Sequence, residues 1–168
     1  VRRGLRAPVF CTHATADLAA LLLRDSARIQ ELDAAYLNKK GRSAEPIVPL
    51  YGVADAESAI RLLRGVPYER AVEVLPNVFV SMYDAGHILG SAAVLLEDKS
   101  DGRTKRLLFT GDVGRKNAPI LRDPVAPPGG ADACICESTY GDREHPPPED
   151  MSEDLFAAIA RASARGGK

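Results

Sequence analysis

The sequence lacks several features that would assign it to a specialised class of protein. No apolar run approaches the roughly 20 residues that a membrane-spanning helix needs, and no signal peptide is visible. The formal net charge of −1 gives no overall basic character, so charge alone does not predict nucleic-acid binding, although it is compatible with a local basic groove. We therefore expect a cytoplasmic protein that does not contact a membrane.

Cysteine is also scarce, with only Cys11, Cys134 and Cys136 in the chain. An odd number of widely spaced cysteines does not predict a disulfide framework. Cys134 and Cys136 flank Ile135, so on a strand both side chains would lie on the same face. We expect buried thiols in a reducing cytosol rather than a metal-binding pair.

Common catalytic motifs and internal repeats are missing as well. The glycines match neither a phosphate-binding loop nor a dinucleotide fingerprint, and no serine has the context of a nucleophile elbow. The 168 residues, 45% of them hydrophobic and 27% charged, are sufficient for one soluble domain with a hydrophobic core.

Helical periodicity appears in three parts of the chain. The predicted helices cover residues 13–37, 53–66 and 148–167. Thr15 is the expected N-cap of the first, Asp55 or a neighbour caps the second, and Gly65 ends it. The first helix carries an apolar stripe, formed by Leu18, Leu21, Leu22, Ile29, Leu32 and Tyr36.

Strand patterns occupy most of the remaining sequence. The predicted strands lie at residues 7–12, in two parts of 70–87 separated at Pro76-Asn77, and at 91–98, 105–112 and 131–139. The last is wholly apolar, which predicts a sheet covered on both faces. Residues 119–130 are rich in proline and predict a surface crossing. The order of elements predicts an α/β fold in which helices flank a mixed sheet.

Three of these strands end in residues that can perform chemistry. His87 follows the strand that ends near Asp84, Asp112 follows Thr110-Gly111, and Glu137 follows Cys136. Strand ends are common positions for active sites because the sheet holds their loops rigidly. One imidazole and two carboxylates form a donor set that suits zinc, or else manganese or iron.

Each of these residues also has a purely structural interpretation. His87 could be a buried histidine with its hydrogen bonds satisfied, Asp112 could be a turn residue or helix cap, and Glu137 could be a surface carboxylate. The residue types and their spacing leave both interpretations open.

The motifs "DAGHILGSA", "LLFTGDVGR", "PILRDP" and "ESTYGDREHP", in this order, resemble those of metallo-β-lactamase-fold nucleases of the β-CASP group. The segment "FCTHATADLAALLLRDSARI" also fits this group. Its members are RNA-processing exonucleases and endonucleases. The resemblance implies that residues 1–168 are part of a metallo-β-lactamase αββα sandwich with a mixed sheet and flanking helices.

The resemblance also implies roles for individual residues. His87 matches a histidine metal ligand, Asp112 matches the aspartate that bridges two zinc ions, and Glu137 matches an acidic catalytic residue that orients a downstream histidine. His145 matches no ligand of the family and is expected to lie in a loop. The implied reaction is phosphodiester hydrolysis of RNA, in which a dinuclear zinc site activates a hydroxide.

The sequence departs from the family pattern in what it does not contain. The H-x-H-x-D-H motif would lie upstream of the matching segment, and the β-CASP domain with its further histidines would lie downstream. We therefore expect a partial metallo-β-lactamase domain. A zinc site takes three or four protein ligands, and of the family's ligands only His87 and Asp112 are present. The 168 residues alone are expected to be inactive and to bind zinc weakly.

Two other functions are compatible with the same fold. The chain could be a non-catalytic scaffold or RNA-binding subunit that has lost its metal ligands, although the retention of His87 and Asp112 argues against this. It could also come from a hydrolase of the same superfamily that acts on thioesters or small esters, although "ESTYGDR" argues against that.

Overall fold

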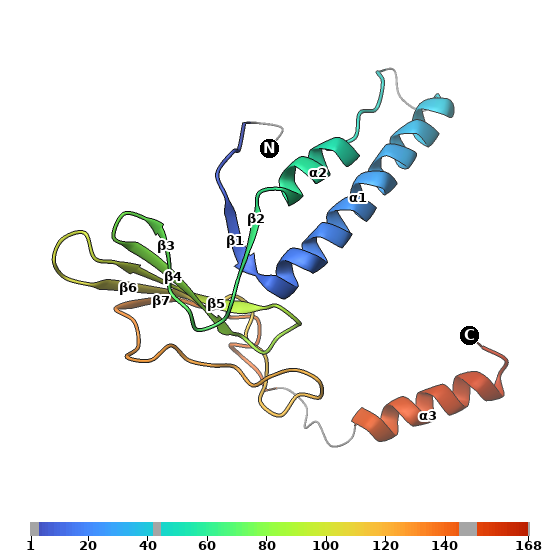
Figure 1. The fold of residues 1–168 in the computed structure, drawn as a ribbon. Coiled ribbons are helices and arrows are strands. Elements are labelled where there is room, and N and C mark those ends of the chain that lie inside the picture. The colour runs from blue at the N-terminus through green and yellow to red at the C-terminus, as the bar shows by residue number, and fades with distance from the viewer. Residues whose placement is uncertain (1–3, 42–44, 145–150, 168) are drawn as a thin grey trace. The chain divides into compact units, whose positions relative to one another are not determined.

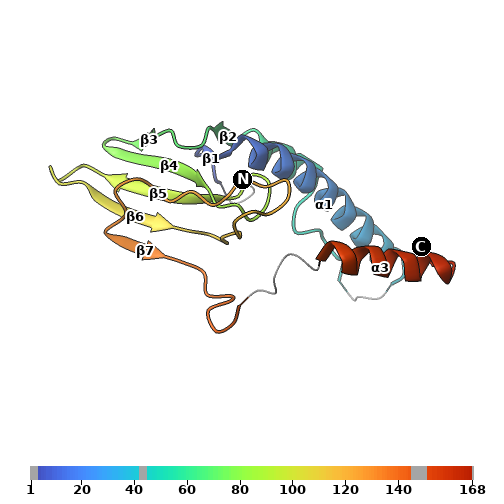
Figure 2. The same cartoon turned by 90° about the horizontal axis from the view of Figure 1, so that it is seen from below.

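The computed structural model describes residues 4–41, 45–144 and 151–167. The chain divides into two units, Val1–Glu137 and Ser138–Lys168, which are described separately. The described residues of the first unit form seven strands and two helices (Figures 1 and 2). In chain order these are β1 (Val9–Thr12), α1 (His13–Lys39), α2 (Val53–Ile60), β2 (Leu63–Val66), β3 (Val72–Leu75), β4 (Val78–Asp84), β5 (Ala92–Asp98), β6 (Lys105–Phe109) and β7 (Ala133–Ile135). The second unit contains α3 (Met151–Ala164).

A two-stranded parallel sheet joins β1 to β2, with Val9 opposite Leu63 and Thr12 opposite Val66. Parallel strands need a long crossover connection, and α1 and α2 provide it. The helix predicted over residues 53–66 is therefore wrong in its second half. It ends at Ile60, and Gly65 lies inside β2 rather than at a helix end, because pairing with β1 outweighs the local helical pattern.

The starts of both helices differ in detail from the prediction. Thr12, not Thr15, is the N-cap of α1, and its side chain accepts a hydrogen bond of 3.1 Å from the Thr15 backbone N–H. Gly52 is the N-cap of α2, and the Asp55 carboxylate accepts a hydrogen bond of 3.2 Å from the Gly52 N–H. Thr15, the predicted N-cap of α1, therefore donates its backbone N–H to the actual N-cap residue, Thr12.

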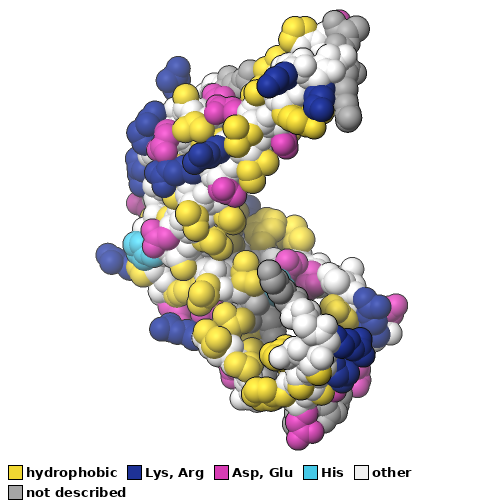
Figure 3. Space-filling model, turned by 90° about the vertical axis from the view of Figure 1, so that its right-hand side faces the viewer, with side chains coloured by type: hydrophobic (Ala, Val, Ile, Leu, Met, Phe, Trp, Pro, Cys, Tyr) yellow, Lys and Arg dark blue, Asp and Glu magenta, His cyan; other side chains and the backbone are white. Residues whose placement is uncertain are grey.

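Small residues form the buried positions of the helix pair. Ala27 and Ala34 are the buried residues of α1, and Ala56 is that of α2. The Arg24 guanidinium joins the two helices through Glu57, with 2.6 Å between Nε and Oε1. The predicted apolar stripe of α1 is mostly exposed, with 40–65% of the surface of each member accessible at Leu18, Leu21, Leu22, Ile29, Leu32 and Tyr36. Hydrophobic side chains are accordingly visible on the upper part of the surface in Figure 3, where α1 and α2 lie.

The second sheet has the strand order β3-β4-β5-β6-β7. Adjacent strands of this sheet are antiparallel, except for β6 and β7, which are parallel. The predicted α/β class with a mixed sheet is therefore confirmed. Strands β4, β6 and β7 consequently run in one direction and end at the same edge of the sheet. The β3–β4 turn lies at Pro76-Asn77 as predicted, and Asn77 has a φ of 64°.

The core of this sheet is formed by Tyr83, Ala93 and Leu95, with Leu108 packed against them. Strand β7 does not contribute to it. The prediction that this strand is covered on both faces is wrong, because β7 is an edge strand and all three of its residues are exposed. Cys134 and Cys136 are exposed as well, whereas Cys11 is the buried thiol.

Two further features follow the sequence pattern. Residues 119–130 contain neither helix nor strand. Helix α3 has Glu153 and Asp154 in its first turn and Arg161 in its last, which is the charge order that the helix dipole favours. Within the described part of the chain, no helix has both the length and the apolar character needed to cross a membrane.

Candidate functional site

The three predicted site residues follow three strands that end at one edge of the five-stranded sheet. His87 lies in the loop after β4, Asp112 in the segment after β6, and Glu137 two residues beyond the end of β7. Because β4, β6 and β7 are parallel to one another, their carboxyl ends share this edge. The sheet topology, rather than proximity in sequence, brings these loops together.

His87 and Asp112 face each other across this edge. Their Nε2 and Oδ2 atoms are 3.8 Å apart, and 47% and 68% of the two side chains are exposed. Zinc lies about 2.0–2.2 Å from nitrogen and oxygen ligands, so two donors on one ion are separated by roughly 3–4 Å. The imidazole and the carboxylate therefore fit two positions around a single metal ion, in both spacing and chemistry.

Glu137 contacts the backbone of the Asp112 segment. Its Oε1 atom accepts a hydrogen bond of 2.7 Å from the backbone N–H of Val113. This bond links the end of β7 to the residue that directly follows Asp112. The Glu137 carboxylate is therefore hydrogen-bonded to the backbone next to Asp112, the candidate metal ligand.

Ser91 organises the loop that carries His87. Its Oγ atom accepts hydrogen bonds from the backbone N–H groups of His87, at 3.1 Å, and of Ile88, at 3.3 Å. The Asp84 carboxylate accepts another from the Gly86 N–H, at 2.9 Å. The sequence analysis missed the role of Ser91, although a serine four residues after the histidine of a glycine-bounded loop is a usable signal for such a turn.

Glycine allows the two loops to approach closely. Gly86 has a φ of +65°, and a Cβ there would lie 2.8 Å from the Arg122 carbonyl oxygen. Gly114 donates a hydrogen bond of 2.7 Å to the Ala85 carbonyl, and Val125 donates one of 2.8 Å to that of Asp84. The segment after β6 is thus tied along the loop after β4, which explains why Asp112 faces His87.

The set of metal donors is incomplete in the part of the chain that the structure describes. No group of three or more His, Cys, Asp or Glu side chains that could hold a metal ion occurs among these residues. His145 lies outside them. A closed zinc site would therefore need donors in addition to His87 and Asp112.

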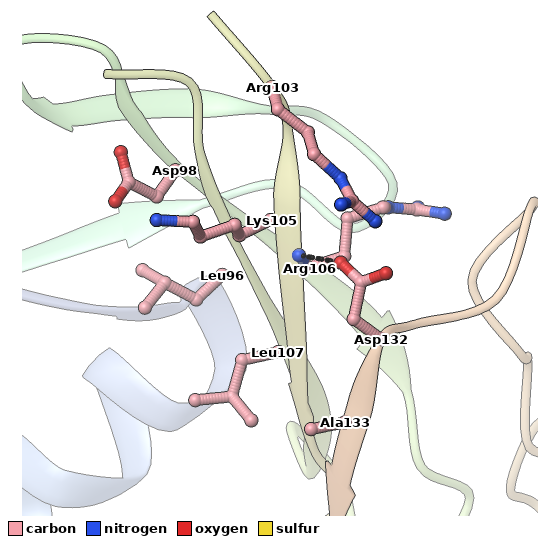
Figure 4. A pocket seen from close by; sticks show the side chains of 8 residues that line it. All are labelled: Leu96, Asp98, Arg103, Lys105, Arg106, Leu107, Asp132 and Ala133. Carbon is pink, nitrogen blue, oxygen red and sulfur yellow. Dashed lines mark hydrogen bonds between the residues drawn. The ribbon is translucent and has the colours of Figure 1, made fainter. Parts of the chain in front are cut away.

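A cavity of about 460 Å³ lies at the other end of the same sheet, where β5 and β6 are joined. It is lined by side chains of both charges and by apolar side chains, namely Leu96, Asp98, Arg103, Lys105, Arg106, Leu107, Asp132 and Ala133. In Figure 4, Lys105 and Leu107 extend to one side of β6, and the dashed line joins the Arg106 N–H to the Asp132 carboxylate, at 2.7 Å. None of the predicted site residues lines this cavity.

Comparison with known proteins gives relatives that include ribonucleases. The chain is 31% identical to a ribonuclease of Thermus thermophilus over 99% of its length, and 32% identical to the endoribonuclease YSH1 of Yarrowia lipolytica over the same share. It is 30% identical to the transcription termination factor FttA of Methanocaldococcus jannaschii, again over 99% of its length. No family model matches the chain.

These relatives confirm the resemblance that the motifs predicted. Over nearly its whole length, the chain is homologous to a segment of the β-CASP metallo-β-lactamase nucleases. It spans 34% of the Thermus ribonuclease, 18% of YSH1 and 24% of FttA. The relatives are thus about three to six times as long as the part they share with this chain.

Proposed function

We propose that these residues form part of a zinc-dependent ribonuclease, in which His87 and Asp112 bind metal and Glu137 supports catalysis. The observation that carries the proposal is the 3.8 Å separation of His87 Nε2 and Asp112 Oδ2, at the edge where three strands end. Relatives that are ribonucleases support RNA as the substrate. A carboxylate and an imidazole on neighbouring loops support a hydrolytic metal site rather than a simple binding surface.

Zinc bound at this edge would supply a Lewis acid and a hydroxide nucleophile at neutral pH. The chain's own contribution is to place the donors. Asp112 presents a carboxylate to the site. Glu137 holds the backbone of Val113, the residue after Asp112, and Ser91 holds the backbone of His87. The exposure of His87 and Asp112 leaves this edge accessible to a large substrate such as RNA.

The remaining parts of the machinery are proposed to lie outside these 168 residues, as an upstream H-x-H-x-D-H segment and a downstream β-CASP domain. Three observations support this. The chain corresponds to about a third of the Thermus ribonuclease. The described residues provide two metal donors where a zinc site takes three or four. Helix α1 has exposed large apolar side chains, and 65% of the surface of Leu21, for example, is accessible. Another part of a larger protein could cover them.

A cytoplasmic location is part of the same proposal. Cys134 and Cys136 are exposed and unpaired. Exposed thiols separated by one residue persist most readily in a reducing compartment.

The test compares RNA cleavage in the presence of zinc by the intact protein and by its Asp112→Ala and His87→Ala variants. Loss of an outer-shell partner of a metal site typically costs about 10–100-fold, so the loss of a ligand should lower activity by at least about 100-fold. Asp101→Ala is the matched control, because this carboxylate lies in the β5–β6 connection and pairs with Lys105. Full RNA cleavage by the Asp112→Ala protein would disprove the proposed role of this residue.

The 168 residues alone should behave differently from the intact protein. With two donors they should retain little zinc after dialysis and should cleave no RNA. Elemental analysis of the purified chain after dialysis measures the retained zinc directly. Two tightly held zinc ions per chain would contradict the proposed division of the site.

A further inference from the structure

The N-terminal turn of α1 contacts the loop that carries His87. Gly90, three residues after His87, directs its carbonyl oxygen at two hydroxyls of this turn. Thr12 Oγ1 donates to it at 2.9 Å, and Thr15 Oγ1 donates at 2.8 Å. These contacts join residues 78 and 75 positions apart in the sequence.

The same loop is held from a second direction. Tyr68, which follows β2, donates its hydroxyl hydrogen to the Ser91 carbonyl oxygen at 2.9 Å. Two consecutive carbonyls of the loop, those of Gly90 and Ser91, therefore accept hydrogen bonds from three hydroxyls of the β1–α1–β2 part of the fold. The side chain of Ser91 is at the same time the acceptor for the His87 and Ile88 N–H groups.

Gly90 makes this approach possible. Its φ is +87°, and a Cβ there would lie 2.8 Å from both the backbone nitrogen and Oγ1 of Thr15. The loop backbone thus lies directly against the first turn of α1. A larger residue would force the two apart.

The three hydroxyls do not have equal roles. The side chain of Thr12 also accepts the Thr15 N–H, so it starts the helix as well as contacting the loop. It lies 2.9 Å from Thr15 Oγ1 too, and because a hydroxyl carries one hydrogen it can donate to only one of its two acceptors at a time. Thr12 is the N-cap of α1, whereas the hydroxyl of Thr15 donates its hydrogen to the Gly90 carbonyl of the loop.

We propose that Thr15 and Tyr68 are positioning residues for His87, which clamp residues 85–91 between the first turn of α1 and the end of β2. This inference rests on the proposed function, in which His87 binds metal. Its physical basis is that an exposed imidazole on a loop must be held by its backbone in order to keep a fixed distance from Asp112. The clamp acts on that backbone and not on the imidazole.

The test compares Thr15→Val, which keeps the shape of the side chain and removes its hydroxyl, with Thr15→Ser, which keeps the hydroxyl. Tyr68→Phe and the double variant remove the second contact and then both. Ser58→Ala is the control, because its hydroxyl also donates to a backbone carbonyl, that of Ala54, but within α2. All variants are made in the intact protein.

Amide hydrogen exchange at His87 and Ile88 is the first measurement. Thr15→Val and Tyr68→Phe should each accelerate it by about fivefold, which corresponds to the loss of one hydrogen bond, and the double variant should accelerate it further. Thr15→Ser and Ser58→Ala should leave it unchanged, as should exchange at Leu95 in every variant. Unchanged exchange in the double variant would overturn the inference, and so would equal acceleration in Thr15→Ser and Thr15→Val.

Zinc-dependent RNA cleavage is the second measurement. The Thr15→Val protein should show a lower kcat with little change in KM, because the clamp orients a metal ligand and does not contact RNA. If the unaltered protein cleaves no RNA, the proposed function fails while the exchange data still decide whether the clamp exists. If cleavage is zinc-dependent and the Thr15→Val protein keeps its full kcat, the inference fails and the proposed function stands.

Discussion

The backbone N–H of Gly114 donates a hydrogen bond of 2.7 Å to the carbonyl oxygen of Ala85. Ala85 precedes His87 by two residues, and Gly114 follows Asp112 by two. The bond thus joins the two loops that carry the candidate metal ligands. It is a backbone contact, so it depends on how closely the two chain segments can approach.

Replacement of Gly114 by alanine should separate these loops. A Cβ at Gly114 would overlap the carbonyl group of Gly86, a backbone group that cannot rotate away. Overpacking of this kind typically costs about 1–3 kcal/mol. Chemical unfolding of the Gly114→Ala protein measures the loss, and the activity of the intact protein should fall with it.

Gly102→Ala is the control for Gly114. Its φ of +72° gives the alanine some backbone strain, but no atom lies within 4 Å of the added Cβ. The Gly102→Ala protein should lose stability without losing activity, because Gly102 lies in the β5–β6 connection, far along the sheet from Asp112. Equal activity of the two variants would contradict the role assigned to the Gly114 contact.

Glu137 should be more tolerant of glutamine than of alanine. The glutamine side-chain oxygen can still accept the hydrogen bond from Val113, whereas alanine leaves this N–H without its partner. Glu137→Ala should therefore lower the free energy of unfolding by about 1 kcal/mol, and Glu137→Gln by less. If RNA cleavage is lost equally in both variants although Glu137→Gln is stable, the negative charge of Glu137 matters in addition to its hydrogen bond.

The three thiols should react at two distinct rates. Cys134 and Cys136 are exposed, whereas Cys11 is buried, and burial raises the pKa of the Cys11 thiol. Because the thiolate is the reactive form, Cys11 should react slowly, both because reagents cannot reach its buried thiol and because its raised pKa leaves less thiolate. A chromogenic disulfide reagent added to the folded chain should titrate two thiols quickly and the third only after denaturant is added. Three fast thiols would place Cys11 at the surface.

Tyr68 should make stability depend on pH in the alkaline range. Burial raises the pKa of its phenol, and the negative charge of Asp84 acts in the same direction. Above about pH 10, the usual tyrosine value, the unfolded chain releases this proton before the folded chain does, so stability falls as the pH rises towards the higher folded pKa. Below about pH 10, the stabilising contribution of Tyr68 to the folded protein is fully present.

The Tyr68→Phe protein provides the comparison. At neutral pH it should be less stable than the unaltered protein by about 1 kcal/mol, because it lacks the hydrogen bond to Ser91. This difference should shrink as the pH rises above about 10, since phenylalanine has no proton to lose. Denaturant unfolding at several alkaline pH values measures it, and a constant difference would contradict the raised pKa.

The residues of the candidate site were proposed from the sequence because their signals are local, and their roles were assigned by the family resemblance. His87, Asp112 and Glu137 each follow a strand pattern, and both a glycine-bounded histidine and an aspartate after Thr-Gly can be recognised without a structure. The sheet topology alone placed the three loops at one edge, because the sequence analysis predicted no strand order. Ser91 was missed because its role depends on the turn geometry of residues 85–91.

By itself, the sequence determined the elements with strong periodicity, the turn at Pro76-Asn77 and the family to which the motifs are related, because these depend on neighbouring residues. Only the tertiary structure decided the rest. Residues 63–66 form a strand because β1 pairs with them, Cys134 is exposed because β7 lies at the edge of the sheet, and Thr15 contacts Gly90 across 75 positions. Each of these outcomes depends on partners far away in the chain, which local patterns do not specify.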